Sequence, residues 1–493
     1  MGSTFGGLNT ALTSLYAQRR GLDVTGQNIA NASTEGYTRQ RVVMQSQNAN
    51  LVPGIYSTTS AVGSGVTVSS VERLRNTALD QRSFTEHANS AYHNERAAAY
   101  NLIEDVFGEP SDTALQGRLQ DMWDGWNSVA ANPDKAAPKA ALLEQATTVA
   151  ATLNDASASL NNQYQSTRLG LDTYVKDVNK AADAIAKLNK EIVVATAAGL
   201  QANELQDQRG MQMLKLAELT GATATELPNG AISVYVGSAP LVSEFNTRQI
   251  EIAPGSALRL EDLDPDGADL DVNLRWTDTE APVAAGGTIG ANMELLAADG
   301  TLDAMVKRLN TVATKLATDI NARTQGGTDV NGDVHDPAYG ADGTPGVAFF
   351  VSGNGLPLSA ANITVNSAVN ATTLAVSSGD PLGVNTPTKI LDGTVADSIS
   401  DLSTSRTGAD AEYQQLIGDL GVSAQSSMRR RDIQNAVTDQ VDAARDSESG
   451  VNLDEEMTNL LTYQRGYEAA SRVLTTIDSM LDQLINRTGL VGR

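Results

Sequence analysis

The C-terminal segment carries a long apolar stripe, which constrains the fold more than any other feature of the sequence. Apolar side chains recur there at alternating spacings of three and four, the period of one face of a continuous α-helix. Such a helix would be a rod of about 50 Å at 1.5 Å per residue. A rod of this length needs a partner along its whole face. The stripe consists of Leu453, Met457, Leu460, Tyr467, Leu474, Ile477, Leu481 and Leu484.

A second stripe lies near the N-terminus. Leu8, Leu15, Leu22 and Ile29 recur every seven residues, and Leu12 lies on the same side. This heptad-like spacing predicts a helix over residues 7 to 31, ended by the turn-forming residues that follow. The two stripes could each pack against their own domain. We interpret them as an assembly surface, because pairing with each other and then with neighbouring copies buries both faces without a separate core.

Between the two stripes the pattern changes several times. Helical spacing runs from Leu74 to about Leu219, with breaks near residues 108–110 and 132–133. Residues 226–285 alternate in the manner of strands, starting at a Pro-Asn-Gly turn signal. A second helix is expected after the Gly-Gly pair at 286 and 287, and a small β subdomain over residues 351–395. Helix resumes near Asp410 and continues almost to the end, with a weak point at residues 449–450.

These patterns predict a mainly α protein with an inserted β domain, in which the terminal helices pair as a coiled coil. We expect three parts, each built from separate stretches of the chain. The first is an inner coiled-coil assembly domain of residues 1–70 with 452–493. The second is a helical-bundle domain of residues 71–225 with 286–350 and 396–451. The third is a small outer β-rich domain of residues 226–285 with 351–395.

Charge and composition exclude several classes of partner. The formal net charge is −24, which argues against nucleic acid and against anionic membrane surfaces, since both are bound by clustered Lys and Arg. The single basic run, Arg429 to Arg431, fits a solvated helix face better than a phosphate site. No apolar stretch reaches the roughly 18 residues of a membrane span. Cysteine is absent, which excludes disulfides and thiolate chemistry.

No motif in the sequence points to catalysis, a cofactor or a metal. The three histidines, His87, His93 and His335, have no ligand spacing, and nucleotide-binding, nucleophile-elbow and zinc-helix motifs are missing. The run Asp262, Asp264, Asp266 and Gly267 matches the opening of a calcium loop, but Asn273 stands where a bidentate Glu is expected. A solvated acidic loop is the favoured interpretation. A secreted enzyme or an adhesin remains the alternative from another class, the latter through residues 226–285 and 351–395.

A resemblance to a known family appears at the same positions. The run from Leu22 to Arg39, LDVTGQNIANASTEGYTR, resembles the N-terminal signature of the flagellar axial proteins, which rod, hook and hook-associated subunits share. Four further segments are similar to hook-associated members in particular. They are Leu205 to Arg209 leading to Gly221, the Gly-Gly pair at 286 and 287 before the second helix, the glycine at 346 followed by Phe349 and Phe350, and Val451 to Glu456 before Tyr463 and Tyr467. A hook or rod subunit is the alternative within the family.

The resemblance implies a structural subunit of the bacterial flagellum, without enzymatic activity, that serves motility. Such a subunit forms a ring with copies of itself at the junction between hook and filament and polymerises through its terminal helices. The hook protein would lie below the ring, and a second junction protein and the filament above it. The chain would be secreted unfolded through the flagellar type III apparatus to an extracellular position. A cytosolic export chaperone would cover the C-terminal helix beforehand.

The resemblance also implies roles for individual residues. Leu8, Leu15, Leu22 and Ile29 would pack against the C-terminal stripe in the inner layer of the tube. Asn28, Asn31, Gly36 and Tyr37 would shape the turn that leaves this layer. In the free subunit both helices lack partners, so folding should be coupled to assembly. Fast amide exchange in residues 1 to 35 and 455 to 493 of the monomer is the corresponding expectation.

Overall fold

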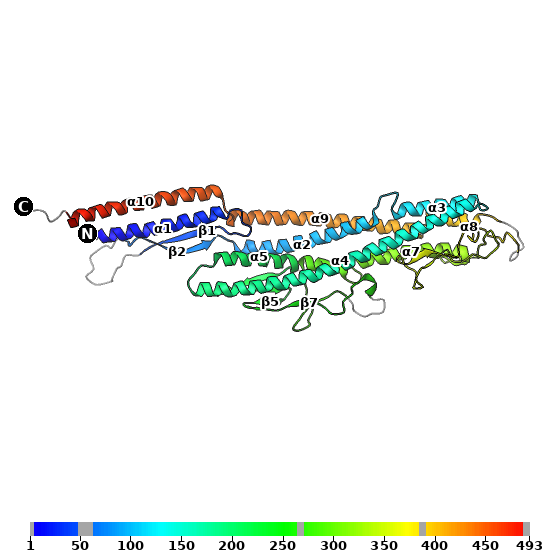
Figure 1. Ribbon diagram of the computed structural model, residues 1–493, viewed down its shortest axis with the longest axis horizontal. Helices are drawn as coiled ribbons and strands as arrows, with labels where there is room; N and C mark the ends of the chain where they lie inside the picture. The colour runs from blue at the N-terminus through cyan, green and yellow to red at the C-terminus, as the bar shows by residue number, and fades with distance from the viewer. Residues whose placement is uncertain (1–3, 48–62, 264–270, 384–390, 487–493) are drawn as a thin grey trace, which may run out of the picture. The chain divides into compact units, whose positions relative to one another are not determined.

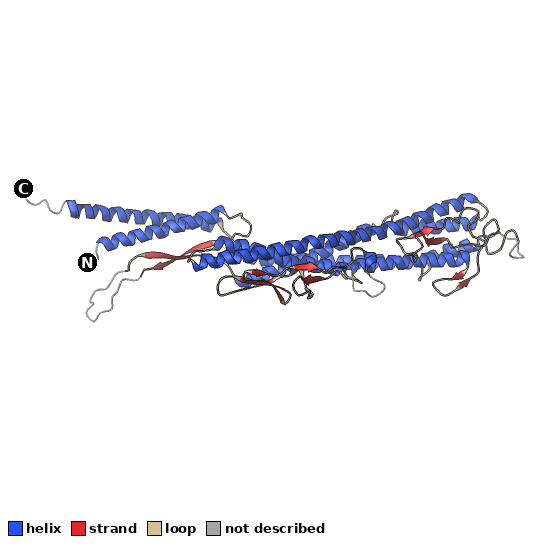
Figure 2. Cartoon of the chain, turned by 60° about the horizontal axis from the view of Figure 1, so that its bottom comes forward, coloured by secondary structure: helices blue, strands red, loops and turns tan. Residues whose placement is uncertain are grey.

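The computed structural model describes residues 4–47, 63–263, 271–383 and 391–486 (Figure 1). Helices dominate these residues and small sheets are inserted between them (Figure 2). The expected fold class, mainly α with inserted β structure and paired terminal helices, is therefore confirmed. The chain divides into two compact units. The terminal unit comprises Met1–Asn89, Val178–Gln249 and Asn435–Arg493, and the central unit comprises Ser90–Asp177 and Ile250–Gln434.

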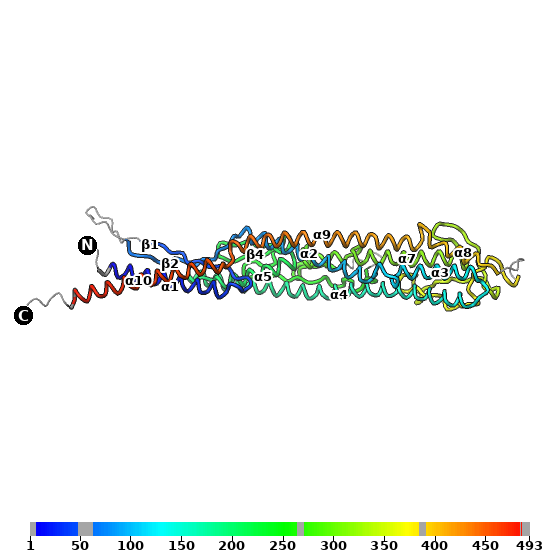
Figure 3. The backbone as a smooth tube through the Cα atoms, turned by 90° about the horizontal axis from the view of Figure 1, so that it is seen from above, coloured from blue at the N-terminus to red at the C-terminus, as the bar shows by residue number. Residues whose placement is uncertain are grey.

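In the terminal unit, the first and last helices pack side by side. Helix α1 spans Thr4–Ala30 and helix α10 spans Leu453–Asn486. They run antiparallel, so the described ends nearest the two termini lie at the same end of the pair (Figures 1 and 3). The helix expected over residues 7 to 31 is thus confirmed. It ends in a turn that includes Gly36, whose φ of 75° suits glycine.

A β-hairpin covers a second face of α1. Strand β1 (Gln40–Ser46) pairs antiparallel with β2 (Val66–Arg73), with a register shift between Val43 and Met44. Val24 of α1 packs with Val42 and Val71 of the hairpin in a small buried cluster. The β-branched pairs and runs at residues 42–43 and 66–68 lie in these two strands, as their preference for extended backbone favours. The hairpin leaves a different face of α1 for α10.

Helices predicted between residues 74 and 219 are present, with one more break than expected. They are α2 (Thr77–Phe107), α3 (Leu115–Ala131), α4 (Ala136–Ala197) and α5 (Asn203–Thr220). The breaks near residues 108–110 and 132–133 are confirmed. The prediction that helix continues without a further break to Leu219 is wrong, because a turn separates α4 from α5 at Gly199, which has a φ of 72°. A lone glycine in a helical pattern is a weak stop signal, so the sequence did not reveal this turn.

A four-stranded antiparallel sheet follows α5 in the terminal unit. Its strands are β3 (Thr223–Glu226), β4 (Ile232–Val236), β5 (Ala239–Ser243) and β6 (Asn246–Thr247). Ile232, Val234 and Val236 are buried, as their alternation predicts. Asn189 of α4, which is also buried, donates to the carbonyl of Ile232 at 2.8 Å and accepts from its N–H at 3.1 Å. The sheet is thereby hydrogen-bonded to the long helix.

The central unit opens with a short ladder and two helices. Strand β7 (Ile250–Ile252) pairs with β8 (Leu274–Trp276), and the 3-10 helix η1 (Leu260–Asp262) lies between them. Helices α6 (Gly287–Leu296) and α7 (Thr301–Gln325) follow. The prediction of a single helix after the Gly-Gly pair is thus wrong. A tight turn divides it at Gly300, where an added Cβ would lie 2.5 Å from the carbonyl oxygen of Glu294.

The region after α7 contains less strand than predicted. Strands β9 (Gly327–Thr328) with β10 (Val334–His335) and β11 (Phe350–Ser352) with β12 (Ile363–Val365) form two short ladders. Within residues 351–383 and 391–395, β12 and the end of β11 are the only strand segments. Asn and Asp side chains capture nearby backbone groups in turns there, as Asn370 does with the N–H groups of Thr372 and Thr373.

The last elements of the chain are helical. Helix α8 (Thr394–Ser400) and the 3-10 helix η2 (Asp401–Thr404) precede α9 (Ala409–Ser449). The expected weak point at residues 449–450 separates α9 from α10 and is confirmed. The described strands of 226–285 share no sheet with those of 351–383 and 391–395. The three-part domain division, with both segments in one outer domain, stays a prediction.

Aromatic side chains form the densest part of the central core. Trp126 of α3 packs against Phe349 with ring centroids 5.2 Å apart, and Phe349 meets Phe350 edge-on at 4.9 Å. Asn321 of α7 donates to the carbonyl of Phe350 at 2.7 Å and accepts from the N–H groups of both phenylalanines. The Phe-Phe pair is therefore held by the Trp126 ring and by the half-buried amide of Asn321.

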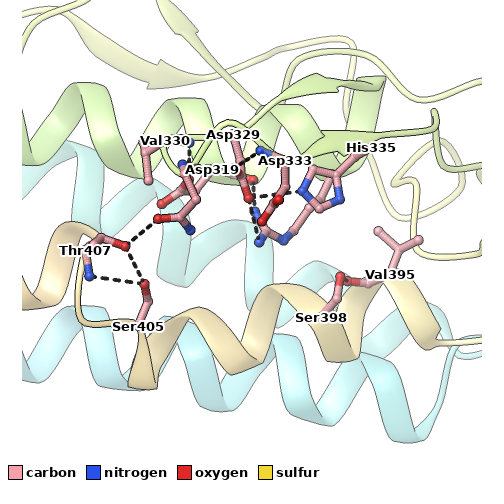
Figure 4. A network of polar contacts seen from close by, with 11 residues as sticks. Asp319, Asp329, Val330, Asp333, His335, Val395, Ser398, Ser405 and Thr407 are labelled. Atoms are coloured by element: carbon pink, nitrogen blue, oxygen red, sulfur yellow. Dashed lines mark hydrogen bonds and ion pairs between the residues drawn. The ribbon is translucent and has the colours of Figure 1, made fainter.

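A polar network organises the turn after α7 (Figure 4). The carboxylate of Asp329 accepts hydrogen bonds from the N–H groups of Asn331 and Asp333 and contacts the His335 ring at 3.1 Å and Arg323 at 3.2 Å. Burial opposes ionisation, yet these partners hold the pKa of Asp329 below its usual value. His335 thus belongs to a structural turn. Among the described residues no group of three His, Asp or Glu could hold a metal ion.

Two further sequence features have limited structural counterparts. In the described part of the chain, no helix is long and apolar enough to cross a membrane. Of the acidic run considered for calcium, Asp262 ends η1. Asp264, Asp266 and Gly267 lie outside the described residues.

Candidate assembly surface

The seam between α1 and α10 is built from close approach of small residues. An added Cβ on Gly21 would lie 2.6 Å from the ring of Tyr463, and one on Gly466 would lie 2.7 Å from Gln18. Gly7 faces Ile477 in the same way at 3.2 Å. The antiparallel helices therefore meet at three places where an aromatic, amide or aliphatic side chain packs against a glycine. A methyl group at Gly21 would push the helices apart.

The predicted N-terminal residues lie beside this seam. Leu8, Leu15, Leu22 and Ile29 are half-buried, whereas Leu12 is 38% exposed. Fully buried positions of α1 are instead smaller or polar, among them Ala11, Ala17 and Thr25. The stripe of leucines is displaced by one position along α1 from the seam glycines, so the leucines lie beside the seam. Their contact with the C-terminal stripe in an inner tube layer stays a prediction.

The predicted C-terminal residues separate into two groups. Leu460, Leu474, Ile477 and Leu481 are half-buried on the side that faces α1. The other group is open to solvent, with Leu453 52%, Met457 50% and Tyr467 37% exposed. The side chain of Leu484 lies outside the described residues. Helix α10 therefore uses only part of its apolar surface within the described chain.

Sequence reasoning missed several members of the open surface. Leu461 is 50% exposed and continues the Leu453 and Met457 flank at a spacing of four. Val473 and Met480 lie on the opposite flank and are 50% and 54% exposed. Single exposed leucines are ordinary on soluble proteins, but continuous apolar flanks indicate an interaction surface. We call the described, exposed members the open flanks: Leu12, Tyr16, Leu453, Met457, Leu461, Tyr467, Val473, Met480 and Ile485.

A buried asparagine fastens the turn at the end of α1. The amide nitrogen of Asn28 donates to the carbonyl of Gln40 at 2.9 Å and to the carboxylate of Glu456 at 3.0 Å. Its oxygen accepts from the Tyr37 hydroxyl at 2.9 Å and from the N–H of Gln40 at 3.0 Å. At 1% exposure the side chain satisfies its whole hydrogen-bonding capacity. One residue therefore joins α1, β1 and α10.

Glu456 extends this connection into an ion pair. Its side chain is 2% exposed, and Arg39 reaches it at 2.8 Å while also contacting the more open Glu455 at 2.7 Å. The N–H of Arg39 donates to the carbonyl of Ser449 at the end of α9. A buried carboxylate is costly unless it is paired and hydrogen-bonded, and Glu456 is both. The first turn of α10 is thus held in a defined position.

The rest of the turn rests on α5. The N–H of Thr38 donates to Asp207 at 3.2 Å, and Asp207 pairs with Arg73 at 2.7 Å. Burial, with the negative charges of Asp207, Glu204 and Glu456, raises the pKa of Tyr37 to about 12, so its hydroxyl remains a donor at neutral pH. An added Cβ on Gly36 would lie 2.6 Å from Met211. The structure thus brings Asn28 and Tyr37 together.

Asn31 and Gly36 have local roles. Asn31 donates to the carbonyl of Gln27 within the last turn of α1 and accepts from Thr34 at 3.2 Å. Gly36 supplies the positive φ that reverses the chain. Asp207 and Glu456, which complete the network, lie in segments that resemble hook-associated members, but the sequence does not reveal what they contact. Only spatial proximity identifies them as partners.

Comparison with known proteins identifies the family. The profile described as "Flagellar hook-associated protein FlgK helical domain" matches residues 100–350, which is half of the chain. The chain belongs to the flagellar hook-associated protein FlgK family. Two further profiles match its ends: "Flagella basal body rod protein" over residues 8–38 and "Flagellar basal body rod FlgEFG protein C-terminal" over residues 445–487. The ends are thus shared with rod proteins, and the helical domain distinguishes the FlgK family.

Full-length relatives support the same family. Flagellar hook-associated protein 1 of Bacillus subtilis is 29% identical over 530 residues, covering 100% of both chains. The protein of the same name from Escherichia coli is 24% identical over 557 residues, covering 97% of this chain and 99% of its own. The hook junction protein FlgK from Burkholderia pseudomallei shares the fold, with a TM-score of 0.58 at 15% identity over 76% of this chain and 100% of that chain.

Membership of the FlgK family confirms the resemblance at the run from Leu22 to Arg39. That run contains Asn28, Gly36 and Tyr37, so the signature of the axial proteins coincides with the turn that joins α1, β1, α5 and α10. The FlgK family is one of flagellar structural proteins. The geometry of this region accordingly holds two helices in place.

Proposed function

We infer that this chain is a structural subunit of the junction between the flagellar hook and the filament, and that it forms a ring with copies of itself. The open flanks of α1 and α10 carry the inference, because they display apolar side chains that the described chain leaves uncovered. Terminal helices of neighbouring copies supply the missing apolar surface. Membership of the FlgK family supports this placement over a hook or rod subunit.

The partners follow from this position in the tube. The hook protein lies below the ring, and the second junction protein and the filament lie above it. The chain is secreted by type III export and works outside the cell. A cytosolic chaperone covers α10 before export, since its flanks would otherwise associate too early. The chain performs no catalysis.

Each part of the chain has a role in this proposal. Residues 1–70 with 452–493 form the inner assembly layer, and residues 71–225 with 286–350 and 396–451 form the helical domain around it. Residues 226–285 with 351–395 face outward. The Asn28 and Glu456 contact orients the start of α10 on α1, so the open flanks of one subunit are presented in a fixed direction. Neighbouring copies then bind a preorganised edge.

The test is genetic complementation followed by electron microscopy of the cell surface. The gene is deleted in its host and restored with the wild-type chain, with Met457→Asp plus Leu461→Asp, or with Leu460→Asp plus Leu474→Asp. The first pair changes side chains that are half exposed, so the subunit should still fold. Val334→Asp plus Leu356→Asp, at positions 81% and 63% exposed in the central unit, is the matched control.

We expect the deletion to leave bare hooks and release filament protein into the medium. Wild type and the control pair should restore attached filaments, and both α10 pairs should fail. Filaments that remain attached without the chain would contradict the junction role. Rescue by the Met457 and Leu461 pair would show that the open flank is not an assembly surface.

A further inference from the structure

One stretch of α9 exposes two large apolar side chains, although Ala424 is buried. Val422 is 70% exposed and Ile433 is 59% exposed, and their separation of eleven positions makes about three turns, so both lie on one face. Inward positions of the same stretch include Ser427, whose hydroxyl is buried without a hydrogen-bond partner. A fully solvated helix face would carry polar side chains at the positions of Val422 and Ile433. The outward face is therefore suited to a partner rather than to water.

Two arginines lie on this face. Arg429 and Arg430 are exposed, and in the described part of the chain neither takes part in an ion pair. Their neighbour Arg431 differs, because it pairs with Asp432 at 2.7 Å. The face thus combines two exposed cationic groups with two large apolar side chains. Together with Arg431, these two arginines form the only run of three consecutive basic residues in the sequence.

Charge determines which partner suits this face. Each copy carries a net charge of −24, so copies brought together in a ring repel one another. Charge repulsion between copies is reduced where a local positive group meets carboxylates. Carboxylates outnumber basic groups by 59 to 35, so most charged groups of a neighbouring copy are carboxylates. Arg429 and Arg430 provide the positive group.

We propose that the face from Val422 to Ile433 docks onto an acidic and partly apolar surface of a second copy of this chain. The two arginines pair with carboxylates of the neighbour, and Val422 and Ile433 bury against its apolar side chains. This contact would be separate from the one made by the open flanks. It rests on the proposed ring, for which it names one subunit-to-subunit surface.

Photocrosslinking in intact flagella tests the proposal. The photoreactive amino acid p-benzoylphenylalanine replaces Ile433 in the full chain, in a strain that lacks the native gene. After irradiation, immunoblotting and mass spectrometry identify what is joined to the chain. The matched control carries the same group at Val334, which is 81% exposed and has no basic run beside it. We expect a dimer of the chain from position 433 and none from position 334.

Charge reversal sharpens the result. Arg429→Glu with Arg430→Glu should lower the yield of dimer by about tenfold, because the arginines would then face carboxylates of the same sign. Arg406→Glu, at another exposed arginine, should leave the yield unchanged. Circular dichroism of the purified variants checks that each one folds.

The remaining outcomes overturn the inference. Crosslinks from position 433 to a different flagellar protein, or no crosslink although the chain is present in the flagella, would remove the second copy as the occupant while the proposed junction role stands. An equal yield after charge reversal would remove the arginines from the contact. Absence of the chain from purified flagella would instead overturn the proposed function, and the inference with it.

Discussion

Helices α7 and α10 carry similar apolar stripes, yet the two stripes differ in how far they are buried. In the central unit, Leu309, Leu316 and Ile320 of α7 are at most 1% exposed. In the terminal unit, Leu453 and Met457 of α10 are half exposed or more. Both stripes follow the three-four spacing of an amphipathic helix. Within the described residues, these α7 side chains are fully covered, whereas α10 is covered only on the side that faces α1.

This difference in burial distinguishes two roles that an apolar stripe can have, stabilising its own chain and taking part in assembly. An apolar stripe shows that a helix needs a partner, but it does not show whether the partner belongs to the same chain. In the central unit the stripe stabilises the subunit. In the terminal unit the seam holds two helices together and leaves the open flanks exposed among the described residues.

The largest contrast should appear in hydrogen exchange. In the monomer, amides of α1 and α10 should exchange faster by orders of magnitude than those of α7, because half-covered helices open locally at low free-energy cost. In assembled flagella the two terminal helices should become protected. Mass-spectrometric exchange measures both states. Slow exchange of α10 in a verified monomer would break the comparison.

Truncation of one leucine in each unit should differ strongly in its effect on stability. Leu316→Ala leaves a cavity in a filled core and should lower the free energy of unfolding by about 2–5 kcal/mol. Leu461→Ala removes a half-exposed side chain and should change it by less than about 0.5 kcal/mol. Urea unfolding of the monomer measures both. Equal losses would mean that α10 is stabilised by its own chain.

Within the terminal unit, the buried Asn28 should matter more than the half-buried Asn31. Asn28→Ala leaves the Gln40 N–H without a partner and removes one of the partners of the buried Glu456 carboxylate, which keeps Arg39. The variant should destabilise the turn by about 1–3 kcal/mol. Asn31→Ala removes hydrogen bonds inside its own turn and serves as the control, with a loss below about 1 kcal/mol. Exchange of the β1 and β2 amides monitors the turn. Similar values for both variants would contradict the assigned role of Asn28.

The smallest effect concerns His87, whose ring lies 2.8 Å from Asp442 and 3.3 Å from Glu218. The Glu218 contact raises the pKa of His87, burial lowers it, and Asp442 adds to the rise, so the folded-state pKa lies above its usual value. The stabilisation is therefore complete below the unfolded pKa of about 6.5 and is lost as pH rises through the folded value.

His87→Gln should accordingly destabilise the terminal unit at pH 5.5 by about 0.2–1 kcal/mol and hardly at all at pH 9. His93→Gln is the control, because burial, Arg430 and Arg96 lower the pKa of His93. That variant should show no such loss at low pH. Unfolding curves across this pH range measure both effects, and a loss at pH 9 equal to that at pH 5.5 would exclude the ion pairs as the cause.

Local pattern was enough to predict much of this protein. Spacing alone located the ends of α1, the break before α10 and the buried face of β4, because these features depend on residues within a few turns of one another. Resemblance added Asn28 and Tyr37 to the candidate site. The turn at Gly199 and the division between α6 and α7 escaped, since glycine permits a turn without requiring one.

The tertiary structure alone decided which apolar and charged groups have partners. Asn28 meets Glu456 across 428 positions of sequence, and no local rule connects them. The exposure of Met457, Val422 and Ile433, against the burial of Leu316, also depends on what the remaining chain covers. Helical periodicity is a property of neighbouring residues and can be seen in the sequence. Burial is a property of the whole packed chain, and so the exposed apolar side chains of α9 and α10 became visible only in three dimensions.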